Sequence, residues 1–598
     1  MALNFNLPNM KPNTINQIAI YTCIFIVFTC SCKKENGNGN VSPKGDLIGL
    51  SFSSSIEGEL IDQELGLKAS NRNSTNPYEE LGTLTGNFQN EDFEVATFVK
   101  NPKLPLGNSM EKKAQNNNQL SDKKQPLKAS APMNTGVKYR VYLRNRTTGH
   151  WQTKVFSSNS TSNQDTIGIY NYYSYDWYAY SNNTASNNDV PDIRSGDILE
   201  VMSDNKDLLW AKGEILASTA TTNQRLGITF QHKLARMQVN IDYRGLFVNT
   251  MASYDFNLGL TGASPTFRKG KLNLTTGNFV TGSHQNYAPA VTPTFPEAGY
   301  LDRQTFYFYS SEAKTFGSVK VSYTSLDYTT YDGKNITYEE LDNKVFTVIG
   351  TGPNNIVTTI GGNTIINFIF IESSVRSGTA PTKWARANLY YEGDNARNPY
   401  RFHRQTTQIG SPPNNNHVPR LNKIPNKDMF MKNHKKPDTY ANRPVQDRTN
   451  QTIYPLGDPC SEVLPKGAWK KPTHQNFLEF VNSVPRPLGS YNGDYFKGIT
   501  HVVGAFNGSN ASYPFDSPYV IFERNGYINN ADQVVSTNNG YYWSDRNPGN
   551  GGGQIGSLLY IVGTNTWPFG NPVWNISVVD QGSHTAASIR CVRTTLYQ

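Results

Sequence analysis

The side chains that most often carry chemistry are scattered through this sequence. None of the nine histidines belongs to an H-E-x-x-H motif, and the chain contains no G-x-S-x-G, Walker glycine loop or C-x-x-C. His403, His417 and His434 lie too far apart, among prolines and asparagines, to predict a metal site. The sequence therefore predicts no catalytic residue, no cofactor and no metal, and the chain is expected not to be an enzyme. A surface glycosidase with two carboxylates is the enzymatic form to look for.

The N-terminal cysteines indicate covalent modification instead. An uncharged apolar run, Ile18–Thr29, precedes them and is too short to span a bilayer, but it has the length of a signal-peptide core. With Ser31 before it, Cys32 resembles the lipobox cysteine of bacterial lipoproteins, which becomes the lipidated first residue of the mature chain. Thr29 stands where that family usually has leucine, and Cys30, directly after Thr29, is a second and weaker candidate. Plain secretion and an uncleaved anchor also stay open.

The other cysteines suit a disulfide. Cys23 and Cys30 would leave with the signal peptide and Cys32 would carry lipid, so Cys460 and Cys591 remain as an even pair in an oxidising compartment. A bond between them would close a loop of about 130 residues and stabilise the fold by about 4–5 kcal/mol through loop entropy. Two separate buried thiols are the alternative.

The elements that would position these residues are mostly strands. From 137 to 144, and again from 236 to 244, the residues of one face alternate with those of the other, which is typical of half-buried strands. No segment from 137 to 371 has sustained helical periodicity. Many short strands at regular spacing predict β-sandwiches. Further strands are predicted between 45 and 61 and at 165–173, 177–180, 197–202, 226–230, 271–274, 305–309, 318–323, 344–349 and 365–371.

Three phrases in this region resemble the fimbrillin-like lipoproteins of Bacteroidetes: Ser195–Leu199, Ile228–Ile241 and Gly270–Gly277. The second contains F-Q-H-K-L-A-R, in which His232 is expected to be structural. The resemblance implies two transthyretin-like β-sandwich domains in a pilus subunit, adhesin or anchor. It also implies other fimbrial subunits as partners, joined by strand exchange after a trypsin-like protease cuts behind an arginine. The candidate cut sites are Arg72, Arg140, Arg144 and Arg146, unless these arginines only line a solvated strand face.

The C-terminal part carries a second resemblance, over about 380–598. Thr473 is a suitable N-cap for a helix whose apolar residues, from 477 to 484, lie near one face before Pro485. The opening C-S-E-V-L-P-K-G-A-W-K-K-P-T, the strand Y-Y-W-S and the ending I-R-C-V-R are similar to motifs of the Fibrobacter succinogenes major paralogous domain. The resemblance implies a C-type-lectin-like α+β domain clamped by the bond between Cys460 and Cys591.

Aromatic residues of this domain are candidates for contact with a glycan or a protein ligand. Aromatic rings can stack on sugars or anchor a partner, although aromatic residues on strands more often belong to the core. The calcium triplets Glu-Pro-Asn and Gln-Pro-Asp are absent, as is an acidic cluster, so no metal is expected. The candidates are Tyr541, Tyr542, Trp543, Trp567 and Trp574.

The net charge of the chain, +9, is confined to one segment. Basic residues exceed acidic ones by that same number between 375 and 450, so the remainder is neutral. Tyr390, Tyr391, Tyr400 and Phe402 interleave with the basic residues, as stacking sites for nucleic acid would. An external lipoprotein meets little nucleic acid, however, and much of the segment is rich in proline and asparagine, so no nucleic-acid partner is expected.

Composition limits the class of protein. Of the 598 residues, 17% are charged, against roughly 25% in an average globular protein, and 12% are aromatic. The chain is too polar for a multi-spanning membrane protein and too aromatic for a disordered one. The fold class is therefore expected to be mainly β, with two transthyretin-like β-sandwich domains followed by the C-type-lectin-like α+β domain.

These observations divide the chain and suggest a function. The expected parts are a signal peptide over 1–31, a polar linker over 32–44, sandwiches over 45–230 and 231–374, and a C-terminal domain over 375–598, with a flexible insertion near 101–131 and a basic segment over 375–450. The expected function is a cell-surface lipoprotein of fimbrillin type: a tip or accessory subunit, or an adhesin that displays its C-terminal domain. It would face outward, lipid-anchored to the outer membrane or assembled on fimbriae. A surface glycan-binding lipoprotein of a polysaccharide-uptake system is the alternative.

Overall fold

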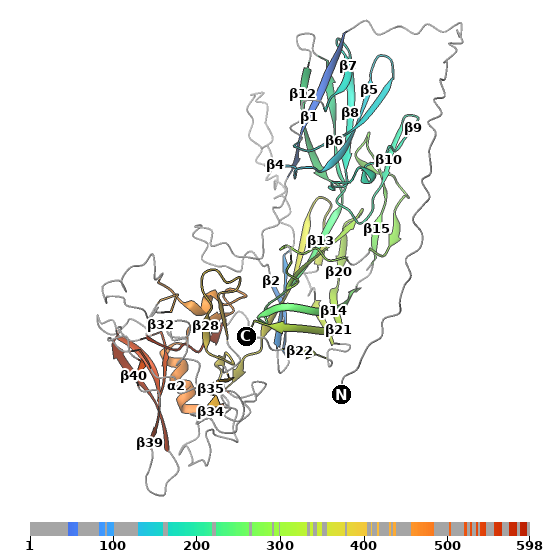
Figure 1. Ribbon diagram of the computed structural model, residues 1–598. Helices are drawn as coiled ribbons and strands as arrows, with labels where there is room; N and C mark the ends of the chain where they lie inside the picture. Colours follow the sequence, from blue (N-terminus) through green and yellow to red (C-terminus); the bar gives the residue numbers. More distant parts are fainter. Residues whose placement is uncertain are drawn as a thin grey trace, which may run out of the picture. The chain divides into compact units, whose positions relative to one another are not determined.

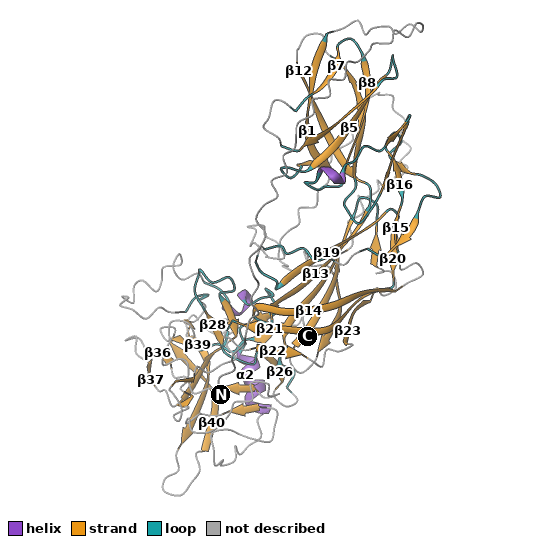
Figure 2. Ribbon diagram, turned by 45° about the vertical axis from the view of Figure 1, so that its right-hand side comes forward, coloured by secondary structure: helices purple, strands orange, loops and turns teal. Residues whose placement is uncertain are grey.

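The computed structural model is mainly β (Figure 1 and Figure 2). The expected signal peptide and linker, Cys32, Arg72, Trp567 and nearly all of the expected insertion lie outside the described residues. The described residues are 46–57, 83–89, 93–100, 130–159, 165–217, 223–261, 266–289, 292–297, 299–331, 335–338, 344–349, 356–376, 380–402, 408–409, 416–417, 430–431, 434–437, 456–483, 501–503, 520–522, 527–528, 534–535, 539–545, 555–564, 573–582 and 586–594.

Eight strands between residues 47 and 232, which we call the first sandwich, form one sheet around a shared core. The order is β4-β1-β12-β11-β8-β5-β6, with β7 also paired to β1. The ring of Tyr139 on β5 lies 5.6 Å from that of Phe230 on β12, although β12 is three places away in this order, so the two halves face each other. Its strands are β1 (Leu47–Glu57), β4 (Ser130–Pro132), β5 (Lys138–Asn145), β6 (Trp151–Ser157), β7 (Ile167–Tyr170), β8 (Ser174–Ser181), β11 (Leu209–Leu216) and β12 (Asn223–His232).

The strand expected at 137–144 is confirmed as β5, with one difference. Tyr142, which the alternation places on the polar face, is fully buried. Its hydroxyl accepts a hydrogen bond from the amide of Ile193 at 2.9 Å and lies 3.1 Å from a carboxylate oxygen of Asp192. The segment that follows β8 therefore covers Tyr142, whereas Lys138, Arg140 and Arg144 on the same face of β5 stay half-buried.

The second sandwich pairs two further sheets. One has the order β19-β13-β25-β3-β2, and the other joins β14, β21, β22 and β23. Phe93 of β3, Val239 of β13 and Val321 of β21 all belong to its core. Its strands are β2 (Thr83–Gln89), β3 (Phe93–Lys100), β13 (Ala235–Gly245), β14 (Val248–Thr261), β19 (Arg303–Ser310), β21 (Ser318–Thr330), β22 (Asn335–Tyr338), β23 (Lys344–Ile349) and β25 (Asn363–Glu372).

The expected first sandwich, 45–230, is wrong in one respect. Strands β2 and β3 fall within that range but belong to the second sandwich, because β3 pairs antiparallel with β25 from Ile365–Lys100 to Glu372–Phe93. The chain thus leaves the first sandwich after β1, contributes β2 and β3 to the second, and returns at β4.

Small sheets complete this half of the chain. They pair β9 (Arg194–Ser195), β10 (Ile198–Met202), β16 (Lys271–Asn273) and β17 (Asn278–Phe279) in one sheet, β15 (Phe267–Lys269) with β18 (Gln285–Tyr287), and β20 (Lys314–Phe316) with β24 (Ile356–Thr358).

The C-terminal part is assembled from short strands around buried aromatic rings. Trp384, Trp469 and Trp543 are all fully buried. The strands that form its sheets are β26 (Val375–Arg376), β27 (Lys383–Trp384), β33 (Trp469–Lys470) and β42 (Val592–Arg593); β28 (Leu389–Tyr391) and β29 (Tyr400–Phe402); β30 (Gln408–Ile409) and β31 (Asn416–His417); β32 (Phe430–Met431), β36 (Tyr527–Ile528), β37 (Val534–Val535) and β41 (Ala586–Ala587); β34 (His501–Val503) and β35 (Val520–Phe522); and β38 (Asn539–Trp543), β39 (Ile555–Thr564) and β40 (Val573–Gly582).

The helix expected after Thr473 is confirmed as α2 (His474–Ser483). The Thr473 hydroxyl accepts a hydrogen bond from the Asn476 amide at 3.2 Å, and the Asn476 side chain accepts one from the Thr473 amide at 2.9 Å, as in a capping box. Phe477 and Phe480 on its inner face are fully buried, and Trp384 stacks on Phe477 at 5.6 Å. Within the described part of the chain, no helix has the length and apolar character needed to cross a membrane.

Candidate functional site

The N-terminal strand β1 is the element best placed for strand exchange. It pairs parallel with β12 along eight residues, from Gly49–Asn223 to Ile56–Phe230, and its other edge pairs antiparallel with β7 and β4. Leu50 and Ile56 are fully buried in the core of the first sandwich. Loss of β1 would therefore unpair most of β12 and uncover an apolar groove, which is the surface that an added strand recognises.

Two of the four candidate cut sites lie inside a central strand. Arg140 and Arg144 belong to β5, whose backbone is paired with both β6 and β8. The Arg140 guanidinium also donates to the Val190 carbonyl at 2.8 Å. A protease needs an extended, unpaired backbone, so neither expectation holds while the sheet is intact.

Arg146 has a different setting, because it lies in the turn after β5. Its side chain is 42% exposed and forms ion pairs with Asp176, at 2.7 Å, and with Glu214. Arg146 is thus the cut-site candidate within the described residues whose backbone lies outside a strand, and its amide donates to the Ser174 carbonyl at 3.0 Å. Arg72, between β1 and β2 in the sequence, lies outside the described residues.

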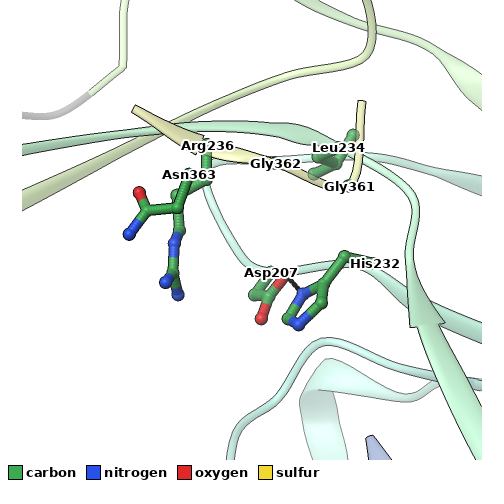
Figure 3. Close-up of a pocket in the computed structure, with 7 residues that line it drawn as sticks. All are labelled: Asp207, His232, Leu234, Arg236, Gly361, Gly362 and Asn363. Atoms are coloured by element: carbon green, nitrogen blue, oxygen red, sulfur yellow. Dashed lines mark hydrogen bonds and ion pairs between the residues drawn. The ribbon is translucent and has the colours of Figure 1, made fainter. Parts of the chain in front are cut away.

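A small pocket lies where β12 ends and β13 begins (Figure 3). His232 Nδ1 is 2.8 Å from Asp207 Oδ1, and the Asn183 side chain donates to the other Asp207 oxygen at 3.1 Å. Figure 3 shows Arg236 and Asn363 on the opposite side of the pocket from this pair. The residues that line it are Asp207, His232, Leu234, Arg236, Gly361, Gly362 and Asn363.

The chemistry of this pocket favours a structural role for His232. Its seven lining residues include no serine, threonine, cysteine or lysine, so the Asp–His pair has no nucleophile there to activate. The amide of Lys233 donates to the Leu208 carbonyl at 2.9 Å, and the Gly361 amide donates to the Leu234 carbonyl at 3.0 Å. The Asp207–His232 pair therefore helps to hold the short connection between the two sandwiches.

The candidate ligand contacts in the C-terminal part do not form one exposed surface. Tyr542 and Trp543 are fully buried, so the expectation that they touch a ligand is wrong, and both are core residues. Tyr541 is half-buried, with its ring 5.0 Å from that of Tyr560. Trp574 lies on β40 opposite Gly563, and Trp567 lies outside the described residues. Tyr541 and Trp574 remain as candidates among the described residues.

The expected disulfide joins the start of the C-terminal part to its last strand. The sulfur atoms of Cys460 and Cys591 are 2.00 Å apart, and both residues are fully buried. Asp458 holds the turn that contains Cys460, because its carboxylate accepts from the amides of Cys460 and Lys471, each at 2.8 Å. Burial raises the pKa of Asp458 above its ordinary value, although these hydrogen bonds oppose the shift.

Two described arginines of the basic segment are tied to the second sandwich. Arg397 forms ion pairs with Glu297, at 2.7 Å, and with Asp302, and its guanidinium lies 3.8 Å from the centre of the Tyr300 ring. Arg386 donates to the hydroxyl of Ser373 at 2.6 Å. These arginines therefore bind groups of the same protein and do not form a free basic stripe.

A second, fully buried contact lies at the same junction. Arg593 Nη2 is 3.3 Å from Glu94 Oε2 on β3 and donates to the Glu372 carbonyl on β25 at 2.6 Å. The other Glu94 oxygen accepts from the Ser374 hydroxyl at 2.8 Å. The Arg593 guanidinium also lies 3.8 Å from the centre of the Trp469 ring. Strand β42, the last one described, is thus held to the outer face of the second sandwich by charge, hydrogen bonds and ring contact.

Among the described residues, no group of three or more His, Cys, Asp and Glu side chains is placed so that it could bind a metal ion.

Comparison with known proteins gives partial likenesses. No family model and no curated protein matches the chain. The fimbrial anchor protein Mfa2 from Porphyromonas gingivalis is 11% identical over 42% of this chain and 91% of its own, with a TM-score of 0.20. A fimbrial assembly protein from Parabacteroides distasonis is 13% identical over 39% and 83%, with a TM-score of 0.21. A protein from Bacteroides fragilis assigned to cell adhesion is 12% identical over 43% and 90%, with a TM-score of 0.22. Each of these alignments covers less than half of this chain.

Proposed function

We propose that this protein is a cell-surface lipoprotein of fimbrillin type, either an accessory or tip subunit of a fimbrium or an adhesin that displays its C-terminal part. In this proposal Cys32 carries the lipid and anchors the uncut chain, facing outward, to the outer membrane. The cut that frees β1 also separates Cys32 from the subunit, which is then assembled on a fimbrium. Its partners are other fimbrial subunits, joined by strand exchange, and a surface glycan or protein bound by the C-terminal part.

The observation that carries the proposal is the position of β1. The strand begins the described chain, is paired on both edges, and contributes the buried side chains of Leu50 and Ile56 to the core. The Ser51 hydroxyl donates to the Gln224 carbonyl on β12 at 3.4 Å, which adds a side-chain bond to the backbone ladder. A strand of another subunit with the same alternation of apolar and polar residues would satisfy the same groove.

Native proteolysis and peptide replacement test this proposal. We expect trypsin to cut the folded mature protein after Arg72, and we expect a labelled peptide of residues 47–57 to bind only after the cut. A matched peptide with Leu50→Asn and Ile56→Asn should not bind, because it loses the side chains that fill the core. Binding of both peptides alike, or of neither, would contradict strand exchange through β1, and an Arg72→Gln variant controls for the cut site.

The tip position has its own test, because it rests on the order of the domains. Immuno-gold labelling should mark the ends of filaments; labelling along whole filaments would contradict it.

The alternative function is a glycan-binding lipoprotein. Two of its five candidate ligand contacts, Tyr542 and Trp543, are buried core residues. Glycan-array binding that is abolished in a Tyr541→Ala, Trp574→Ala variant, without fimbrial assembly, would restore it.

A further inference from the structure

Three large apolar side chains stand out at one end of the first sandwich. Leu47, Tyr172 and Leu216 are 66%, 68% and 65% exposed, and no other large hydrophobic residue in the described part of the chain is as exposed. Single exposed apolar residues are common on protein surfaces, whereas a group of them marks a contact.

The strand pairing brings these three residues to the same end of the first sandwich. Leu47 pairs with Tyr170, the last residue of β7, and Leu216 pairs with Ser174, the first residue of β8. Tyr172 lies in the turn that connects those two strands, so it lies between the start of β1 and the end of β11. Figure 1 shows β1 and β7 side by side at this end. We call Leu47, Tyr172 and Leu216 the end surface.

The backbone of Tyr172 is a second, independent observation. Its φ is +66°, in the left-handed region that glycine and asparagine adopt readily and that a bulky side chain rarely does. Because the ring is 68% exposed, packing inside the fold does not compensate for the backbone strain of this conformation. The turn therefore presents a tyrosine outward at a position where the fold alone would favour a smaller residue.

The course of the chain indicates what this surface meets. Leu47 follows directly on the segment that begins at Cys32, and the roughly 14 residues between them reach at most about 50 Å when fully extended. If Cys32 is lipidated, as the proposed function holds, the end surface is tethered close to a bilayer. Leucine and tyrosine are suited to that boundary, where an amphipathic ring lies at the level of the headgroups.

We infer that the end surface formed by Leu47, Tyr172 and Leu216 docks on the lipid membrane that holds the N-terminal anchor. This inference rests on the proposed function, because it requires the lipid at Cys32. Docking would hold the first sandwich of the uncut protein at the membrane surface.

Site-directed fluorescence tests the inference on the full, lipidated protein. In the mature protein of the proposal, the lipid occupies the thiol of Cys32, and Cys460 is bonded to Cys591. A cysteine introduced at Tyr172 is then the one thiol that reacts with the fluorescent label. The matched control is the label at Ile360, which is 45% exposed and lies beside the connection between the sandwiches. Both proteins are reconstituted into phosphatidylcholine vesicles that contain brominated lipid.

Quenching at the Tyr172→Cys label should exceed that at the Ile360→Cys label by at least about twofold, because an interfacial side chain lies about 5–10 Å into the headgroup boundary. Leu47→Ser with Leu216→Ser should reduce the difference, and both sites are exposed, so the variant should melt at the wild-type temperature. Equal quenching at both labels would overturn the inference. So would protection of the Tyr172 label by self-association in solution, which would assign the surface to a second copy.

Mass spectrometry of the N-terminal peptide separates this failure from that of the proposed function. If Cys32 carries lipid and the labels are quenched alike, the docking surface is wrong and the lipoprotein stands. If Cys32 carries no lipid and the protein leaves the membrane fraction, both are wrong.

Discussion

Replacing Arg593 by methionine should weaken the attachment of the C-terminal part to the second sandwich by about 3–5 kcal/mol, the usual effect of removing one member of a buried ion pair. The Arg593 and Glu94 side chains are 0% and 1% exposed, with their nitrogen and oxygen 3.3 Å apart. Without the guanidinium, the Glu94 carboxylate keeps its hydrogen bond from Ser374 but has lost the cation of this pair. Methionine still fills the space over Trp469, so the loss reports charge more than packing.

A double-mutant cycle measures this effect. Urea unfolding of the mature protein gives the free energy of unfolding for Arg593→Met, for Glu94→Gln and for the double variant. Because the double variant buries neither charge, it should regain most of the loss. The control is Arg376→Met, an exposed arginine on β26, which should change stability by about 0.5 kcal/mol or less. A loss below about 1 kcal/mol for Arg593→Met, or additive losses in the double variant, would refute the reasoning.

Three further changes test the core and the junction. Removing the disulfide by Cys460→Ser with Cys591→Ser should cost about 4–5 kcal/mol, because the bond spans a sequence separation of 131 residues, and thermal melting with and without reductant measures it. Trp543→Ala should lower the free energy of unfolding in urea by about 3–5 kcal/mol, because the side chain is buried in the core. Near-wild-type stability would contradict this burial and make Trp543 a candidate ligand contact again. Hydrogen bonding to Arg397 holds the pKa of Glu297 below its ordinary value, so this pair stabilises the fold above about pH 4.3 and ceases to do so as pH falls through the lowered pKa. Arg397→Gln should therefore raise the Glu297 pKa in an NMR titration and flatten the loss of stability in acid, and an unchanged titration would contradict the contact.

Strands with one apolar face were predictable, and their surroundings were not. The alternation at 236–244 locates β13 correctly, yet the polar face of this strand is also buried: Asn240 is 3% and Asp242 3% exposed. The Asn240 side chain donates to that of Asn367 on β25 at 2.9 Å, and the Asn363 side chain on β25 donates to that of Gln238 at 2.9 Å. The two-residue alternation of apolar and polar side chains identifies a strand. It does not reveal that polar side chains far apart in sequence form hydrogen bonds with one another inside the protein.

Strand β3 was missed for a related reason. Its sequence, F-E-V-A-T-F-V-K, is buried from Phe93 to Val99, so no exposed face marks it as a strand of a sandwich. Phe93 and Val95 face the core of the second sandwich, whereas Ala96 and Phe98 pack with the C-terminal part. A strand covered on both sides loses the alternation by which strands are recognised, and its membership in a sheet depends on a partner more than 250 residues away, Asn363–Glu372.

The candidate sites show the same limit. A cysteine count and a helix cap depend on a few residues, so the bond between Cys460 and Cys591 and the helix after Thr473 followed from the sequence. Burial of Tyr542 and Trp543 depends on what packs over β38, which no local pattern contains.

The position of the charge has a functional consequence. A nucleic-acid stripe requires arginines that release counterions and bind phosphates, and each phosphate contact must compete with whatever the arginine already binds. Arg397 already bridges Glu297 and Asp302, and Arg593 already lies between Glu94 and Trp469. If these arginines bound phosphate, those carboxylates would stay buried or half-buried without a cation. The free energy lost in this way exceeds the free energy gained from a surface contact with phosphate. Arg397 and Arg593 thus act within the protein, where they hold the C-terminal part to the second sandwich.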